Sequence, residues 1–391
     1  MTKMVGMEVS IAVAEAAKLA NVDVVAVYPI TPQTHVVEHL ADLVANGELD
    51  AEYIPVESEH SALSACLGSA AAGARTFTAT ASQGLELMQE TLYVASGMRL
   101  PIVMVVANRA VSAPLSIWGD HSDVMTVRDT GWIQIFNENG QEIVDNVICA
   151  FRIAENHKVL LPIMVHMDGF HMSHVIEPIL LPSEEQVRNF LPTHKYPLPL
   201  HPSKPVAMGD FAPPFIFTEA RWAHEQCLRG SKEVIINVWN EFAKEFGRQY
   251  KPVETYKTEN AKTVLFTMGS FSETAMSSID IMREKGLEVG LIRLRLWRPF
   301  PFEELRDALK GVETLIVLDR ALSTGGPGGP VSSEIRAALY NSNPRPNVVS
   351  FVGGLGGRDI TIEGFETIVR QGMEIAKSGT NKEFQIFGVR E

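Results

Sequence analysis

Short apolar runs alternate with longer stretches of helical period along the first part of the chain. Residues 22–30 (VDVVAVYPI), 76–82 (TFTATAS) and 100–108 (LPIVMVVAN) are mostly apolar or β-branched, which predicts buried strands. Residues 8–20 and 35–47 instead carry apolar side chains at helical spacing. Strands that are apolar on both faces and separated by helices are typical of a parallel sheet in an α/β fold.

The alternation continues with a strand at 51–58, helices at 60–74 and 84–98, and further elements through residue 170. In parallel sheets the functional loops lie at the carboxyl ends of the strands. Residues 28–33, 57–60 and 108–112 follow three of the predicted strands. We therefore expect these loops, which are scattered in the sequence, to converge in the fold.

The pattern changes at residues 181–215, where prolines are frequent. Proline removes a backbone donor and disrupts helices and central strands, so we expect a linker or an extended surface segment without a regular core element. Residues 216–249 then predict one long helix that ends near Gly247.

A second α/β unit begins at about residue 262, after a linker at 241–261. Residues 262–270, 287–297 and 313–319 predict strands, with helices between them. The chain therefore divides into a first domain over 1–240, which includes the proline-rich segment, and a second domain over 262–391.

Composition and charge exclude several classes of function. The formal net charge is −13, and no stretch concentrates Lys and Arg, which argues against nucleic acid as a partner. The longest apolar run lies near residues 100–107 and is too short to span a membrane. The N-terminal residues do not form a signal-peptide core, so we expect a cytoplasmic protein. Three scattered cysteines, Cys66, Cys149 and Cys227, predict neither disulfides nor an iron–sulfur cluster on this chain.

Motifs for nucleotides, metals and nucleophiles are weak. The glycine clusters at 68–73, 325–329 and 353–357 fit neither a P-loop nor a dinucleotide fingerprint, so loop geometry is the better interpretation. Histidines at 157, 166, 171 and 174 surround Asp168 in the sequence, but their spacing suits a loop after a strand more than a ligand set. We expect no metal site.

Residues 56–62 (VESEHSA) place two carboxylates between a predicted strand and an apolar helix. Ser58 and the acidic residues suit the start of a helix, where a side chain caps the backbone and negative charge meets the helix dipole. A carboxylate in apolar surroundings can also be held ready for acid/base chemistry. From the residues alone both interpretations stay open, with capping favoured.

Several longer motifs resemble the pyruvate:ferredoxin oxidoreductase family. They lie, in order along nearly the whole chain, at residues 28–32 (YPITP), 56–62, 77–85 (FTATASQGL), 100–104, 108–110, 117–123 (IWGDHSD), 128–132, 298–301 (RPFP) and 354–359 (GLGGRD). The length is similar to that of the separate alpha subunit of the multi-subunit enzymes.

The resemblance implies a thiamine-diphosphate enzyme subunit. Residues 1–240 resemble the domain that binds the pyrimidine ring of the cofactor, and residues 262–391 resemble the transketolase C-terminal domain. The G-D-G…N motif that binds the diphosphate and Mg²⁺ in this family is not found in the sequence. The resemblance therefore implies a cofactor shared with a diphosphate-binding beta subunit, together with a gamma subunit and a ferredoxin-like subunit that carries [4Fe-4S] clusters.

The resemblance also implies roles for individual residues. Glu59 matches the glutamate that bonds the pyrimidine ring and promotes its imino form, which is acid/base work through the cofactor. Thr31 and Arg109 match the residues that hold the 2-oxoacid carboxylate, a task that suits the donor fork of arginine. The expected cofactor contacts are Pro29, Ile30, Thr31, Glu59, Ser82 and Arg109.

The implied reaction is reversible oxidative decarboxylation of a 2-oxoacid with coenzyme A, which gives an acyl-CoA, CO₂ and two electrons for ferredoxin or another acceptor. Pyruvate is the favoured substrate, and Thr31 disfavours oxalate. Three alternatives stay open: an aryl or branched substrate such as phenylglyoxylate or 2-oxoisovalerate, a transketolase-like or decarboxylase component without iron–sulfur partners, and a non-catalytic assembly module with the same fold.

Overall fold

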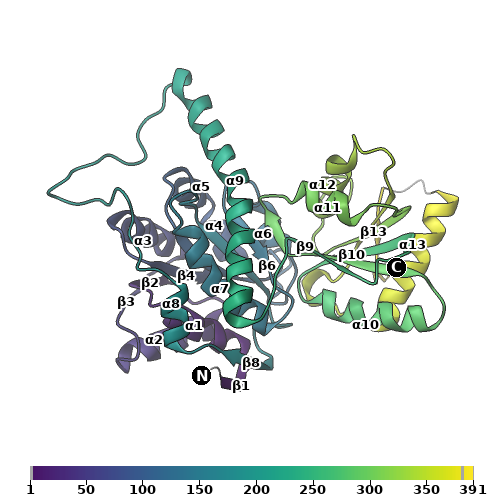
Figure 1. Ribbon diagram of the computed structural model, residues 1–391, viewed down its shortest axis with the longest axis horizontal. Coiled ribbons are helices and arrows are strands. Elements are labelled where there is room, and N and C mark those ends of the chain that lie inside the picture. The colour runs from purple at the N-terminus through teal and green to yellow at the C-terminus, as the bar shows by residue number, and fades with distance from the viewer. Residues whose placement is uncertain (1–2, 380–382, 391) are drawn as a thin grey trace.

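The computed structural model describes residues 3–379 and 383–390 and contains two α/β units joined side by side (Figure 1). The α/β fold class predicted from the sequence is confirmed. Residues 1–2, 380–382 and 391, which the predicted domain ranges include, lie outside the described residues.

The first unit is built on a seven-stranded sheet in the described part of the chain, with strand order β12-β6-β7-β5-β4-β2-β3. The neighbouring strands from β6 to β3 are parallel, whereas β12 pairs with β6 in the antiparallel direction. The strands are β2 (Val24–Val27), β3 (Glu52–Pro55), β4 (Thr76–Thr80), β5 (Ile102–Asn108), β6 (Ile133–Phe136), β7 (Ile163–Asp168) and β12 (Leu296–Arg298).

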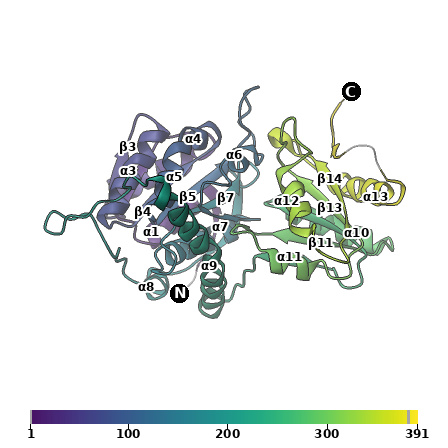
Figure 2. The same cartoon turned by 90° about the horizontal axis from the view of Figure 1, so that it is seen from above.

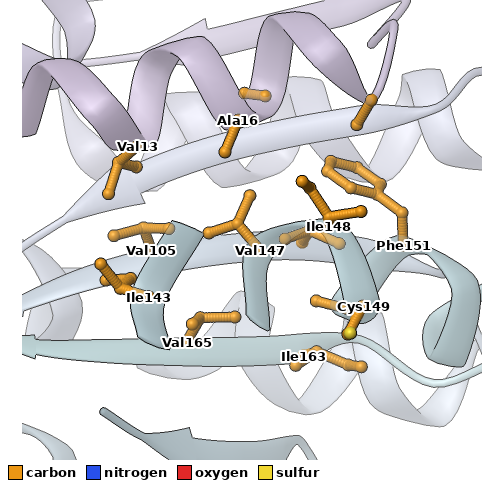
Figure 3. Close-up of a cluster of buried hydrophobic side chains, with 14 of the residues drawn as sticks. Val13, Ala16, Val105, Ile143, Val147, Ile148, Cys149, Phe151, Ile163 and Val165 are labelled. Atoms are coloured by element: carbon orange, nitrogen blue, oxygen red, sulfur yellow. The ribbon is translucent and has the colours of Figure 1, made fainter. Parts of the chain in front are cut away.

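Helices cover both faces of this sheet because its central strands are apolar on both sides. One face packs against α1 (Val9–Leu19), α2 (Thr34–Ala45), α7 (Gly140–Ala154) and α9 (Pro214–Phe246). The other packs against α3 (Glu59–Ala72), α4 (Ser82–Leu87) and α5 (Gln89–Gly97). Val105 of β5 lies in the first core, where Figure 3 shows Val13 and Val147 nearby, and Met104 lies in the second.

Smaller elements complete the first unit. The strands β1 (Lys3–Glu8) and β8 (Ile176–Leu181) form an antiparallel pair, and α6 (Ser122–Thr126) follows the long loop after β5. The expectation that residues 181–215 hold no regular core element is wrong, because α8 (Glu184–Phe190) begins there at a capping box made by Ser183 and Gln186. This helix buries Val187 and Phe190. Its prolines flank it at 182 and 192, where they do not interrupt its hydrogen bonds.

The predicted long helix is confirmed as α9, which ends at Gly247 in the left-handed conformation, with φ of 77°. Its C-terminal half buries Ile235, Trp239 and Phe242 in the first core. Its N-terminal end projects from the body of the molecule together with the extended segment before it (Figure 1).

The second unit holds a six-stranded sheet among the described residues, in the order β15-β14-β13-β10-β11-β9. Its strands are β9 (Val253–Tyr256), β10 (Thr263–Met268), β11 (Val289–Leu294), β13 (Thr314–Asp319), β14 (Asn347–Val352) and β15 (Gln385–Ile386). On one face lie α10 (Phe271–Glu284) and α13 (Ile362–Ser378), and on the other α11 (Phe302–Ala308) and α12 (Pro330–Leu339). A short 3₁₀ turn spans Leu355–Gly357.

The strand predicted at 287–297 is two strands. After β11 the chain turns at Arg295, and β12 joins the sheet of the first unit beside β6. Arg295 is buried at this turn, where its Nη2 lies 2.6 Å from Glu142 Oε1 of α7. The second unit therefore contributes an edge strand and a buried ion pair to the first.

A second polar junction joins the units near the two glycine clusters. Asp168 at the end of β7 lies 2.6 Å from Arg320 Nη1 and accepts hydrogen bonds from Ser270 N and Oγ. Gly357 N donates to Gly119 O at 2.8 Å, so the cluster at 353–357 is a contact between units, consistent with the preference for loop geometry. Figure 2 shows the two units from above, with the loop before α6 between them.

Two further features concern the cysteines and the lengths of the helices. Cys66 and Cys149 are buried, and burial raises the pKa of the Cys66 thiol to about 12, which makes it inert. Across residues 3–379 and 383–390, every helix falls short of the length or apolar character that crossing a bilayer demands.

Candidate active site

The strand order reverses between β2 and β4, and we use the term crevice for the carboxyl edge of the first sheet at this reversal, where the segments after β2, β3, β4 and β5 meet. From β2 the chain passes to β3 on one side, and then to β4 on the other side of β2. Open α/β sheets bind ligands at such a reversal. Gln33 spans it, since its Nε2 donates to Tyr28 O at 2.8 Å and to Ala79 O at 3.2 Å.

Arg109 connects the loops after β2, β4 and β5. Its side chain donates to Thr31 O at 2.9 Å, to Ser116 O at 2.9 Å and to Gln83 Oε1 at 3.3 Å. The residue is buried, and burial lowers the pKa of its guanidinium, against the opposing charge of Asp123. Guanidinium carries five N–H donors, so these three bonds leave two for a ligand. The predicted convergence of the first and third loops is confirmed at this residue.

The two carboxylates of residues 56–62 have different surroundings. Ser58 is the N-cap of α3 and accepts from Ser61 N at 3.2 Å, which confirms the capping interpretation for the serine. Glu57 is exposed and accepts from Ser61 Oγ at 2.5 Å. Glu59 is the first residue of α3 and is buried, and no hydrogen bond to its carboxylate is found among the described residues. Glu59 is therefore the carboxylate with capacity to bind something else.

Gly84 makes room for the Glu59 side chain. A Cβ atom at position 84 would lie 2.7 Å from Glu59 Oε1 and 2.5 Å from Thr80 Oγ1, closer than Cβ contacts allow. This glycine lies in α4, directly after the strand β4. The second predicted loop thus meets the β4 loop, so all three loops gather on the same crevice.

Asp123 fixes the positions of Ser82 and Arg109, and its role has no counterpart in the sequence-based predictions. Its Oδ2 accepts from Ser82 N at 3.1 Å and from Arg109 N at 3.0 Å, and its Oδ1 accepts from Asn108 Nδ2 at 3.0 Å. It is fully buried, and burial raises its pKa to about 7 against these hydrogen bonds. The only signal was its place in the motif at 117–123, which carries no chemical role by itself.

The remaining predicted residues line the same edge. Ser82 is buried, with φ of 45°, and donates to Ala110 O at 2.6 Å. Pro29 and Thr31 are exposed on their loop, whereas Ile30 is half-buried against the first core. The structure therefore brings Thr31, Ser82 and Arg109 into one network through side chains and backbone, and places Glu59 next to it.

Several buried polar atoms around the crevice lack partners in the part of the chain that the structure describes. They are Gln33 Oε1, Thr80 Oγ1, Gln83 Nε2 and Asn108 Oδ1. Burying polar groups without hydrogen bonds is costly, so groups of this kind near a crevice indicate a polar ligand.

Comparison with known proteins identifies the family. The model of the pyruvate flavodoxin/ferredoxin oxidoreductase thiamine-diphosphate-binding domain matches residues 15–239. The chain belongs to the pyruvate:ferredoxin oxidoreductase family. The model of core domain II of pyruvate:ferredoxin oxidoreductase matches residues 261–365.

Individual relatives span almost the full length. The pyruvate synthase subunit PorA of Methanocaldococcus jannaschii is 52% identical, over 92% of this chain and 92% of that protein. The ketoisovalerate oxidoreductase subunit VorA of Pyrococcus horikoshii is 44% identical, over 94% of this chain and 93% of that protein. A 2-oxoglutarate:ferredoxin oxidoreductase of Magnetococcus marinus shares the fold, with a TM-score of 0.70 and 20% identity. The match covers 95% of this chain and 65% of that one.

The expected enzyme class is confirmed, since a family member with this domain is a subunit of a thiamine-diphosphate-dependent 2-oxoacid oxidoreductase. The buried carboxylate of Glu59 and the unpartnered atoms of Thr80, Gln83 and Asn108 supply acceptors and donors that suit an aminopyrimidine ring.

Proposed function

We propose that this chain is the pyrimidine-binding subunit of a complex that oxidises pyruvate with coenzyme A to acetyl-CoA and CO₂, reversibly, and passes two electrons to ferredoxin. The observation that carries the proposal is the buried Glu59 carboxylate beside the Arg109 and Thr31 loop, in a member of this family. Thiamine diphosphate, when bound, supplies the carbon centre that attacks the keto group of the substrate.

Glu59 would hold the aminopyrimidine ring through its ring nitrogen. The position at the start of α3 places the carboxylate near the positive end of a helix dipole, and Gly84 leaves space above it. A carboxyl group there can share a proton with the ring nitrogen and so select the tautomer that accepts a proton at the exocyclic nitrogen. The protein contributes the position and the charge of this carboxylate. A glutamine at position 59 would have the same size, but it would carry neither the charge nor the proton of the carboxyl group.

Arg109 would bind the carboxylate of the 2-oxoacid with its two spare N–H donors, and the Thr31 hydroxyl would add a third. The bond from Arg109 to Thr31 O fixes the loop from which that hydroxyl extends. Asp123 orders the backbone on both sides through Ser82 N and Arg109 N. Because these binding groups are already held in place by hydrogen bonds, they lose little conformational entropy when the substrate binds.

Partner subunits would complete the site. Apolar side chains close to Arg109 are exposed on the loop after β5, with Leu115 at 76% and Trp118 at 50% exposure. A second exposed apolar group lies on the projecting end of α9 and the segment before it, and comprises Phe211, Phe215, Ile216, Phe217 and Trp222. Clusters of exposed apolar side chains are typical of subunit interfaces. We assign the diphosphate and Mg²⁺ to a beta subunit, and the [4Fe-4S] clusters to a ferredoxin-like subunit, with a gamma subunit as the remaining partner.

The identity of the 2-oxoacid substrate is the most specific part of the proposal. Pyruvate is favoured by the 52% identical relative whose name refers to it, and a branched 2-oxoacid is the second candidate, because a 44% identical relative is named for ketoisovalerate.

The test is an assay of the complex purified anaerobically from its source through this chain. Coenzyme-A-dependent reduction of a low-potential acceptor is measured with pyruvate, 2-oxoisovalerate, phenylglyoxylate and 2-oxoglutarate. Preferred turnover of pyruvate is the expected result. Turnover confined to a branched or aryl acid would keep the role of the site and replace the substrate. A complex that holds thiamine diphosphate and clusters but turns over no 2-oxoacid would refute the proposal.

A further inference from the structure

Glu8, His35 and His174 come from three separate elements and meet beside the crevice. Glu8 ends β1, His35 lies in the first turn of α2, and His174 lies in the connection between β7 and β8. One candidate ligand atom from each residue lies within 4.8 Å of the other two. They are far apart in the sequence, which is why its spacing predicted no metal ligands.

We propose that Glu8, His35 and His174 bind one divalent transition-metal ion of the zinc class. Two imidazoles and one carboxylate form a common three-ligand set for zinc, in which water takes the remaining position. His35 Nδ1 lies 2.6 Å from Glu8 Oε1, and the ring centroids of His35 and His174 are 4.7 Å apart. Small side-chain rotations would bring the three ligand atoms to the ~2.0–2.2 Å that zinc requires.

The backbone holds two of the ligands in fixed relative positions. Val9 N donates to Val175 O at 3.0 Å, and Ser10 N donates to Ser173 O at 3.0 Å. Ser10 Oγ also donates to Ser173 O at 2.7 Å, and Ser10 is buried. These bonds lie directly after Glu8 and on both sides of His174, so they hold the backbones that carry the two side chains next to each other. A preformed pair of this kind reduces the entropy lost when an ion binds.

Ser173 orients the His174 ring. Its Oγ lies 2.7 Å from His174 Nδ1 and accepts a hydrogen bond from Phe170 N at 2.9 Å. When Nδ1–H donates to this oxygen, the lone pair of Nε2 is free, which is the usual outer support of a metal-binding histidine.

The ion would connect elements that carry the crevice. A row of ring contacts runs from Trp118 to Phe170 at 4.5 Å, and from Phe170 to His174 at 4.6 Å. His35 lies in the helix that begins directly after the Thr31 loop. Binding would therefore fasten the first turn of α2 to the β7–β8 connection. It makes no use of the proposed substrate or of the partner subunits.

A matched control lies one turn further along α2. His39 of α2 and Glu15 of α1 form a contact of 2.9 Å between Nε2 and Oε1, with similar exposure of both side chains. It resembles the His35–Glu8 contact, but the described residues place no third ligand beside it. His39→Gln therefore reports the loss of a histidine–glutamate pair without the loss of the proposed site.

The test uses the full-length chain, stripped with a chelator and titrated with Co²⁺, whose visible absorption reports nitrogen and oxygen ligands at a four- or five-coordinate ion. The wild type is expected to take up one ion per chain and to melt ~2–4 °C higher in its presence. His35→Gln and His174→Gln should weaken uptake by about 100-fold or more, and His39→Gln should leave it unchanged. Equal uptake by all four chains would overturn the proposal, as would no uptake by the wild type.

A second measurement covers variants that fail to fold. Wild-type crystals grown with Co²⁺ are examined for anomalous scattering at the cobalt absorption edge. A peak between the three side chains supports the site. Peaks elsewhere only, at saturating Co²⁺, refute it.

Discussion

Asp123 and Asp319 are buried aspartates at the carboxyl edges of the two sheets, and both accept backbone N–H groups. Burial raises the pKa of each to about 7 against those hydrogen bonds. Asp319 accepts from Val331 N at 2.7 Å and Ser332 N at 3.0 Å, so it caps one helix, α12. Asp123 instead joins Ser82 N, at the start of α4 directly after β4, to Arg109 N, in the loop after β5. Asp319 therefore stabilises the start of one helix, whereas Asp123 fixes the relative positions of two segments that border the crevice.

Arg320, which follows Asp319 in the sequence, and Arg109, whose N–H bonds Asp123, also have different partners. Arg320 is committed to the junction between units, through Asp168 at 2.6 Å and Gly119 O at 3.1 Å, and its guanidinium lies 3.9 Å above the Phe271 ring centre. Arg109 instead bonds residues of the first unit alone, and its two remaining N–H donors are the ones proposed above to bind a ligand. The carboxyl edge of the second sheet therefore contributes to the junction between the units, whereas the same edge of the first sheet carries the proposed binding site.

The largest effect is expected for Glu59→Gln, which removes the crevice carboxylate without changing its volume. Acid/base contributions of positioned side chains are typically 10²–10⁴-fold, so turnover of the complex should fall by at least about 100-fold. The measurement is coenzyme-A-dependent acceptor reduction by complexes of equal cofactor content. Glu57→Gln, two residues away and exposed, should change it less than about twofold. Full activity in Glu59→Gln would favour a non-catalytic assembly module.

Asp123→Asn and Asp319→Asn compare the two edges directly. In each variant an amide N–H₂ group replaces an acceptor that faces backbone donors, which costs about 1–3 kcal/mol of stability. Asp123→Asn should also reduce turnover about 10-fold, because misplacing the Arg109 loop misaligns the substrate. Asp319→Asn should leave turnover per folded complex within about twofold. Denaturant unfolding and turnover are measured on both, and equal turnover would remove the functional difference between the edges.

Gly84→Ala tests the space above Glu59. The new Cβ meets Glu59 Oε1 and Thr80 Oγ1 inside contact distance, so the carboxylate has to move. Crowding in a packed site costs about 1–3 kcal/mol, and we expect weaker binding of thiamine diphosphate and a several-fold loss of turnover. Gly97→Ala is the matched control, because a Cβ there meets no atom within 4 Å. Cofactor retention after gel filtration separates the two variants, and equal retention would show that Glu59 tolerates displacement.

Much of this edge could be predicted from the sequence because it depends on local patterns. Apolar runs predicted the strands, Ser58 predicted the start of α3, and Gly247 predicted the end of α9. The convergence of the three loops followed from the rule that parallel strands end at one edge. Individual roles for Thr31, Glu59 and Arg109 came from family resemblance, and they stay predictions.

What could not be predicted depends on contacts between distant segments. The switch of β12 to the first sheet occurs at Arg295, whose partner Glu142 lies 153 residues away. Asp123 gives no local sign of holding Ser82, 41 residues earlier. The helix α8 was missed because proline frequency hid a capping box at Ser183. Glu8, His35 and His174 likewise meet only through the tertiary structure.

The smallest effect concerns His166 of β7, which lies beneath the crevice beside Asn108 and stacks on Phe136 at 4.5 Å. Burial, and then the charge of His121, lower its pKa well below the usual value, against the opposing charge of Asp168. The unfolded chain binds a proton here near pH 6.5, whereas the folded chain does not, so stability is lost as the pH falls below about 6.5.

His166→Gln removes the proton uptake of this imidazole on unfolding. The free energy of unfolding should then fall less steeply between about pH 6.5 and 5, with a change in slope of at most ~1.4 kcal/mol per pH unit. Denaturant unfolding at several pH values measures the slope, with the exposed His201→Gln as the control expected to leave it unchanged. Identical slopes in the wild type and His166→Gln would mean that other residues cause the loss of stability at low pH. A flatter slope would locate part of the acid sensitivity in the first unit, beside the proposed site and away from the edge of the second sheet.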